Sequence, residues 1–174
     1  FEDVADAVGL GGMRNTAGVA FADIDNDGDQ DLYLSSVGDD QNYLFVNTNG
    51  QFQEVAALRG VDLATGNPHT GTSVAFADFD NDGYLDLYAG DWHTHALGMY
   101  ASHARLFRNL GSANPGFFED VTNAAGVNVD DVYLQSDDNI DGVFVLSAGF
   151  ADLDDDGWLD LLLTSDFGCT RLFW

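Results

Sequence analysis

The residues best suited to chemistry are aspartates that occur three times in one pattern, Asp-x-Asp-x-Asp-Gly-x-x-Asp. The copies run from Asp23 to Asp31, from Asp78 to Asp86 and from Asp152 to Asp160. Each copy places four carboxylates at alternate or near-alternate positions around a glycine that can adopt positive φ, so a tight loop can turn them toward one point. Carboxylates crowded in this way repel one another unless a cation lies between them. The pattern therefore predicts three calcium-binding loops.

An EF-hand loop begins with similar residues and is the main alternative. It needs a glutamate at the twelfth position, where this chain has Leu34, Ala89 and Leu163. The flanking segments also lack a helical period. We therefore expect each acidic loop to close with its ninth-position aspartate, on a β-hairpin.

Each acidic loop is embedded in a longer repeat of four strand-like segments. In the first copy an apolar segment ends at Asp23, a second starts at Asp31, a third carries the Leu44-Phe pair, and Asn49-Gly50 is a hairpin turn signal before the fourth. A recurring four-stranded unit is typical of propeller blades. We expect an all-β chain that forms part of a β-propeller, with about three four-stranded blades of a larger ring or of a ring completed by further copies.

The repeat also divides the chain, although residues 1–174 are expected to form a single propeller segment. Residues 1–6 correspond to the fourth strand of a preceding blade, 17–58 to blade one, 71–122 to blade two and 146–174 to an incomplete blade three. Three blades cannot close well, because propellers hold typically about four to eight. We therefore expect residues 1–4 and 170–174 to lie apart, in a fragment of a longer protein or in a ring completed by association.

The chain resembles the FG-GAP (VCBS-type) repeat family of calcium-binding β-propellers, to which integrin α chains belong, and is similar to repeats associated with ASPIC/UnbV proteins. The motifs Phe-x-Asp-Val, Phe-Ala-Asp-x-Asp-x-Asp-Gly-x-x-Asp-Leu and Leu-Phe-x-Asn carry the resemblance over nearly the whole chain. It implies calcium ligands from the side chains at loop positions one, three, five and nine and from the backbone carbonyl at position seven. In this sequence the ligands would be Asp23, Asp25, Asp27, Asp31 and the Asp29 carbonyl; Asp78, Asp80, Asp82, Asp86 and the Tyr84 carbonyl; and Asp152, Asp154, Asp156, Asp160 and the Trp158 carbonyl.

Composition restricts which partners the chain can bind and where in or outside the cell it can work. The formal net charge is -25, with 30 acidic residues against five arginines and no lysine, which excludes binding to nucleic-acid phosphates or anionic membranes by charge. Partners should be cationic or neutral. No apolar run approaches the length of a membrane helix, and Cys169 alone cannot form an internal disulfide. Because low-affinity calcium modules work at extracellular calcium levels, we expect a secreted, cell-surface or periplasmic location.

Loop lengths indicate the recognition face. Insertions fall within residues 90–104 and 123–145, in connections expected on the face opposite the acidic loops. The first insertion includes Trp92, His93, His95, Met99 and Tyr100, which favours a contact patch. We therefore expect a protein or glycan partner to bind through residues 91–103 and 130–141.

The favoured function is a noncatalytic, extracytoplasmic calcium-binding module for protein or glycan binding, adhesion or assembly of a surface complex. The alternative is an accessory or catalytic domain of a metal-dependent or redox enzyme, with His93 and His95 plus His103 or Asp91 as transition-metal ligands. Residues 137–142 could hold a fourth calcium ion, although an irregular acidic loop is the favoured interpretation. The sequence has no serine in a nucleophile-elbow context and no glycine-rich phosphate loop after a strand, so an enzyme is the less favoured class.

Overall fold

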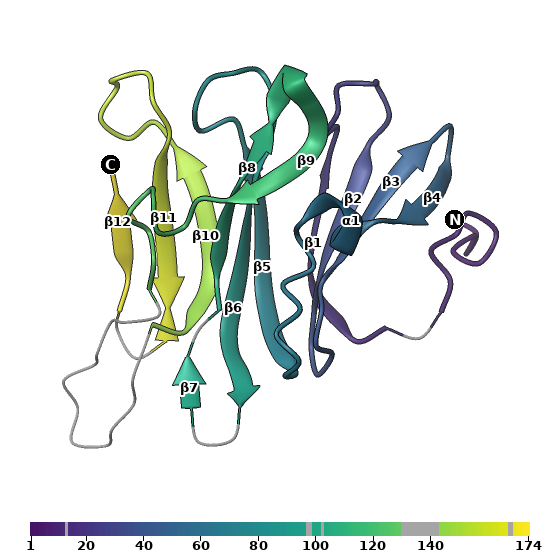
Figure 1. Cartoon of the computed structure of the whole chain (residues 1–174), viewed down its shortest axis with the longest axis horizontal. Coiled ribbons are helices and arrows are strands. Elements are labelled where there is room, and N and C mark those ends of the chain that lie inside the picture. Colours follow the sequence, from purple (N-terminus) through teal and green to yellow (C-terminus); the bar gives the residue numbers. More distant parts are fainter. Residues whose placement is uncertain (13, 97–98, 102, 130–142, 167–168) are drawn as a thin grey trace.

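The chain forms three antiparallel β-sheets that stand side by side (Figure 1). The structure is a computed structural model that describes residues 1–174 except 13, 97–98, 102, 130–142 and 167–168, and it describes residues 93–96 and 99–101 by their backbone alone. The first sheet has the strand order β1-β2-β3-β4. Its strands are β1 (Thr16–Ala22), β2 (Asp31–Ser36), β3 (Tyr43–Thr48) and β4 (Gln51–Glu54), followed by the short helix α1 (Ala56–Arg59).

The second sheet has the order β5-β6-β8-β9, and β7 pairs with β6. Its elements are β5 (His69–Ala77), β6 (Asp86–Ala96), β7 (Met99–Ala101), β8 (Arg105–Leu110), the 3-10 turn η1 (Gly111–Ala113) and β9 (Asn114–Asp120). The third sheet has the order β10-β11-β12. Its strands are β10 (Val145–Ala151), β11 (Asp160–Ser165) and β12 (Arg171–Phe173).

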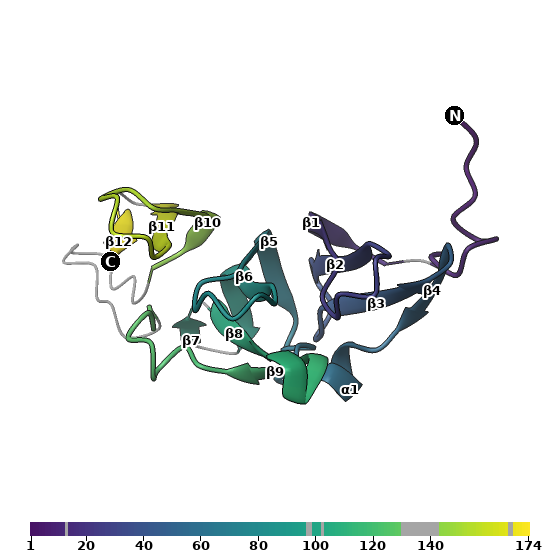
Figure 2. The same cartoon turned by 90° about the horizontal axis from the view of Figure 1, so that it is seen from above.

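The sheets agree with the predicted all-β fold and are consistent with propeller-like blades. Seen from above, the three sheets follow one another along an arc, with the two termini at opposite ends (Figure 2). The closed ring and the division into blades stay predictions. In this chain residues 1–4 are irregular and residues 5–9 form turns, and the assignment of residues 1–6 to the fourth strand of a preceding blade stays a prediction. A strand needs a hydrogen-bonded neighbour, and here Val8 contacts the first sheet instead, its carbonyl accepting from the Phe52 N–H at 2.8 Å.

The acidic loops lie together at one end of the sheets, the upper end in Figure 1, which we call the acidic-loop face. The β3–β4 turn reaches the same end, where the Asn49 N–H donates to Asp29 Oδ2 at 2.7 Å. The β6–β7 hairpin projects from the other end, the opposite face, with His95 paired to Tyr100 in backbone register. The predicted sharing of one face by the acidic loops and the β3–β4 turn is confirmed.

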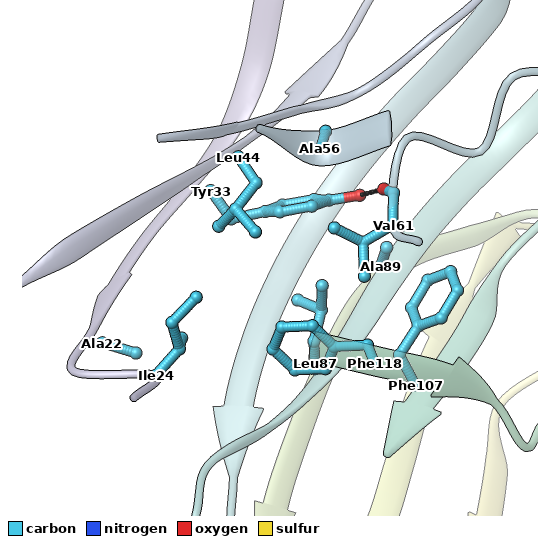
Figure 3. Packing of buried hydrophobic residues seen from close by; sticks show 10 residues of the cluster. All are labelled: Ala22, Ile24, Tyr33, Leu44, Ala56, Val61, Leu87, Ala89, Phe107 and Phe118. Carbon is cyan, nitrogen blue, oxygen red and sulfur yellow. Dashed lines mark hydrogen bonds between the residues drawn. The ribbon is translucent and has the colours of Figure 1, made fainter. Parts of the chain in front are cut away.

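Two hydrophobic cores join the sheets. Because side chains alternate along a strand, β6 directs Leu87 and Ala89 into the core shared with the first sheet and Tyr88 into the core shared with the third. Figure 3 shows the first core, where the Tyr33 hydroxyl donates to the Val61 carbonyl at 2.7 Å. The second core includes Leu161 and Leu163 of β11 and the buried Cys169. Each acidic loop therefore connects two strands whose apolar side chains pack in one of these cores.

Candidate metal centres

The three acidic loops share one backbone conformation. The predicted positive φ of the sixth-position glycine is confirmed, at 95° for Gly28, 89° for Gly83 and 90° for Gly157. The fourth position also adopts positive φ, at 59° for Asn26, 57° for Asn81 and 62° for Asp155. This second left-handed residue was not predicted from the sequence, although asparagine and aspartate are the residues other than glycine that tolerate positive φ best. Two left-handed residues per loop turn the carboxylates inward.

The structure brings most of the predicted ligands together. In each loop three carboxylates offer oxygen atoms that all lie within 4.8 Å of one another. The groups are Asp23, Asp25 and Asp27; Asp78, Asp80 and Asp86; and Asp152, Asp154 and Asp160. Asp31, Asp82 and Asp156 lie outside these closest groups, and the ligand role of the Asp29, Tyr84 and Trp158 carbonyls stays a prediction.

Backbone N–H groups hold the carboxylates in place, in the same way in each loop. The first-position Asp23 accepts from the N–H groups of Asp27 at 3.0 Å and Gly28 at 2.9 Å. The fifth-position Asp27 accepts from the Asp29 N–H at 2.9 Å. The corresponding residues of loops two and three repeat all three bonds. Because these bonds fix the side chains before any ligand arrives, little further ordering would be needed on metal binding.

The ninth-position aspartates are buried under the loops. Asp31 accepts from the N–H groups of Ile24 and Asn47, and Asp86 accepts from those of Phe79 and Asn109. Burial raises the pKa of Asp31 to about 6 and that of Asp86 to about 7, although the hydrogen bonds oppose the rise. In the metal-free chain these carboxyl groups therefore take up protons far more readily than exposed ones.

In loops one and two the third-position aspartate carries an oxygen that no protein group satisfies, whereas Asp154 Oδ1 in loop three accepts from the Asp156 N–H at 3.2 Å. Oδ1 of Asp25 and Oδ1 of Asp80 are buried without a hydrogen-bond partner. The pKa of each carboxyl is raised, first by burial and then by the nearest acidic neighbour, Asp27 for Asp25 and Asp82 for Asp80. An unsatisfied buried polar group costs about 1–3 kcal/mol. Clustered carboxylate oxygens with unused lone pairs are the donors that Ca²⁺ prefers, so the residues present fit this ion.

Part of the chain matches a known repeat family. Residues 29–89 match the FG-GAP-like repeat. That segment contains the whole second acidic loop, and the match supports the FG-GAP resemblance, while the ASPIC/UnbV relation stays a prediction.

The chain is similar to three known proteins over a longer stretch. The chain is 35% identical over 115 residues to cartilage acidic protein 1 of Mus musculus, 34% to that of Homo sapiens, and 33% over 114 residues to that of Xenopus tropicalis. The alignment covers 63% of this chain and 17% of each relative. The chain thus spans about a sixth of the length of these relatives. Across the described residues, the structure has no helix that is both long and apolar enough for a membrane span.

A buried histidine and aspartate lie together away from the acidic loops. His69, which the sequence analysis missed, is buried and lies 3.2 Å from Asp91, Nδ1 to Oδ2. Asp91 also accepts from the N–H groups of Thr70 and His103. Its oxygens therefore bond to protein groups within the fold. The side chains of His93 and His95 and the acidic segment 137–142 lie outside the described residues, so the transition-metal and fourth-calcium hypotheses stay predictions.

Proposed function

We propose that this chain is a noncatalytic, extracytoplasmic module whose three acidic loops bind calcium and thereby hold neighbouring blades rigid. The observation that carries the proposal is the unsatisfied, buried Oδ1 atom at the same position of two loops, Asp25 and Asp80. Bound calcium would supply a compact divalent charge that accepts about six to eight oxygen ligands. The aspartates at positions one, three, five and nine would hold it, with the position-seven carbonyl.

The chain's own residues prepare these sites. Position-one and position-five carboxylates are oriented by backbone N–H groups, and position-nine carboxylates tie each loop to the strands beneath it. The assembled charge of four carboxylates opposes the folded loop without a cation. Calcium therefore stabilises the loop by removing that repulsion.

Chelation tests the proposal. If free calcium exceeds the dissociation constant tenfold, each site contributes about 1.4 kcal/mol and three contribute about 4 kcal/mol, a large share of a domain's usual 5–15 kcal/mol, roughly. Excess chelator should therefore lower the melting temperature sharply, measured by circular dichroism against a calcium-saturated sample. A melting temperature that is the same in chelator and in calcium would contradict the proposal.

The surroundings of the module are part of the proposal. The relatives bear the name of an acidic cartilage protein, and this chain is also strongly acidic. A secreted, cell-surface or periplasmic location supplies the calcium that such loops need. Further blades, or further copies of the chain, would cover the third sheet, where Leu162 and Leu172 are exposed, and the adjoining acidic loop, where Leu153 is exposed.

A protein or glycan partner is proposed to bind the opposite face. The β6–β7 hairpin projects there, whereas the acidic loops are short and fixed by hydrogen bonds. Trp92 packs against Phe144, with ring centroids 5.5 Å apart, so it also supports the fold beneath the hairpin. The double variant His95→Ala/Tyr100→Ala changes two residues paired in the hairpin register and leaves Trp92 in place, so it tests recognition by the hairpin.

Arrays of neutral glycans and of cationic peptides supply the probes for this test. The His95→Ala/Tyr100→Ala variant should lose most of the binding of the parent chain, because it removes a tyrosine, a residue type enriched at interfaces, together with its partner in the hairpin register. Gln30→Ala, on the acidic-loop face, is the control and should bind as the parent does. Loss of binding in Gln30→Ala with retention in the double variant would contradict the assignment of faces.

A further inference from the structure

A hydrogen bond from an asparagine side chain joins loop one to loop two, and a second such bond joins loop two to loop three, each across the boundary between sheets. The side-chain amide of Asn26 in loop one donates to the Gly83 carbonyl in loop two, Nδ2 to O at 3.0 Å. The side-chain amide of Asn81 in loop two donates to the Gly157 carbonyl in loop three at 3.2 Å. Donor and acceptor occupy the same loop positions, four and six, in both cases. The bonds therefore form a directional series from each loop to the following one.

The accepting peptide is held at both of its ends. The Gly83–Tyr84 peptide has its carbonyl bonded to Asn26, while its N–H donates to Asp82 Oδ1 at 2.9 Å. The Gly157–Trp158 peptide has its carbonyl bonded to Asn81, while its N–H donates to Asp156 Oδ1 at 2.8 Å. Fixing this peptide fixes the direction in which it presents its N–H to the position-five carboxylate. A preorganised ligand loses less entropy on binding its ion.

We propose that Asn26 and Asn81 are positioning residues, each of which raises the calcium affinity of the loop that follows its own in the chain. This inference rests on the proposed calcium function and assigns regulation of those sites. Both donors share a positive φ, 59° for Asn26 and 57° for Asn81, and both amides reach the following loop. Since calcium would order the donor loop as well, binding at one site favours binding at the next, which is a reciprocal coupling.

The junction between loops two and three tests the role of the asparagine more cleanly than the junction between loops one and two. Loops one and two have a second link, because Asn109 Nδ2 donates both to the Ile24 carbonyl at 2.8 Å and to the Leu85 carbonyl at 3.1 Å. Loop three also contains its own reporter: Trp158 stands at position seven, where loop one has Asp29 and loop two has Tyr84. Tryptophan transfers excitation to a nearby lanthanide ion, and terbium takes the hard oxygen ligands that calcium takes.

Terbium titration of the 174-residue chain, with tryptophan-excited luminescence, measures affinity at loop three. The signal assigned to that loop is the part lost in Trp158→Phe, which separates it from Trp92 and Trp174. Asn81→Gly should weaken terbium binding there by roughly two- to tenfold, the equivalent of one net hydrogen bond. Glycine adopts φ near +57° without strain, and melting in chelator verifies that the variant folds.

Asn26→Gly is the matched control, because it removes the same amide one loop earlier. It should lower the terbium affinity of loop three less than Asn81→Gly does, because it acts there only through the coupling from loop two. It should also weaken the loop-two site in a calcium calorimetric titration. An Asn81→Gly affinity equal to that of the parent, or an equal loss in Asn26→Gly, would overturn the proposal. A parent chain that binds neither terbium at Trp158 nor calcium would instead overturn the calcium function itself, so the two failures are distinguishable.

Discussion

The first and third sheets contain the same repeat but differ in how their outer residues are covered. Tyr33 of β2 is 0% exposed, whereas Leu162, at the corresponding position of β11, is 38% exposed. Ile24 in loop one is 0% exposed, whereas the corresponding Leu153 in loop three is 54% exposed. Both buried residues lie in the core that the first sheet shares with the second. The motif thus places apolar side chains at equivalent positions of each unit. These side chains are buried only where the following sheet packs against them.

Side chains on both faces of the strand that follows each acidic loop are apolar, because a sheet packs against each face in a complete stack of units. β11 buries Leu161 and Leu163 against the second sheet and directs Leu162 away from it. This is the alternation expected of a strand between two layers. The stability of each unit therefore depends on its neighbour, as in other repeat proteins.

The largest expected effect comes from Tyr33→Ala. This substitution removes a fully buried ring and the hydrogen bond to the Val61 carbonyl, and it should lower the free energy of unfolding by about 3–5 kcal/mol. Leu162→Ala, on the exposed face, is the control and should cost less than about 1 kcal/mol. Urea denaturation in saturating calcium measures both. Equal losses would contradict the view that the neighbouring sheet, and not the motif, creates the core.

A smaller expected effect is a dependence of the chain's stability on pH in the absence of calcium. The folded-state pKa of Asp31 is about 6 and that of Asp86 about 7, both above the unperturbed 3.8. Between these values the folded metal-free chain binds more protons than the unfolded chain, so its stability falls as the pH rises through about 6 to 7. In chelator, the melting temperature should be higher near pH 5 than near pH 8.

Asp86→Asn sharpens the pH experiment, because it removes the carboxyl group with the more strongly raised pKa. The variant should show a flatter dependence of melting temperature on pH than the parent. Calcium should reverse the trend in the parent, since the ion competes with protons for the same oxygens. A melting temperature in chelator that rises steadily from pH 5 to pH 8, roughly, would contradict the assigned cause, burial of these carboxyl groups.

The sequence predicts those parts of the molecule that depend on local pattern. Alternation and turn residues predict the strands around each acidic loop and the β3–β4 turn at Asn49-Gly50. The glycine at position six predicts one left-handed residue per loop, confirmed at Gly28, Gly83 and Gly157. These features follow from residues within a few positions of one another.

Contacts between segments distant in the chain were not predictable in the same way. The bond from Asn26 to Gly83 joins residues in different sheets, and nothing local marks the asparagine as a donor to another loop. His69 meets Asp91 only because β5 and β6 pair beside the β6–β7 hairpin. The assignment of residues 1–6 to a strand stays a prediction for the same reason, since a strand forms only beside a hydrogen-bonded partner.

Calcium calorimetry tests the central claim most directly. Titration of the chelator-treated chain should give three equivalents of bound calcium, and Asp82→Ala, which alters one carboxylate in loop two, should give two. The matched substitution Gln30→Ala, within loop one at a position that contributes no ligand side chain, should retain three. Absence of calcium binding by the parent chain, or an unchanged stoichiometry in Asp82→Ala, would contradict the account of three aspartate-built sites.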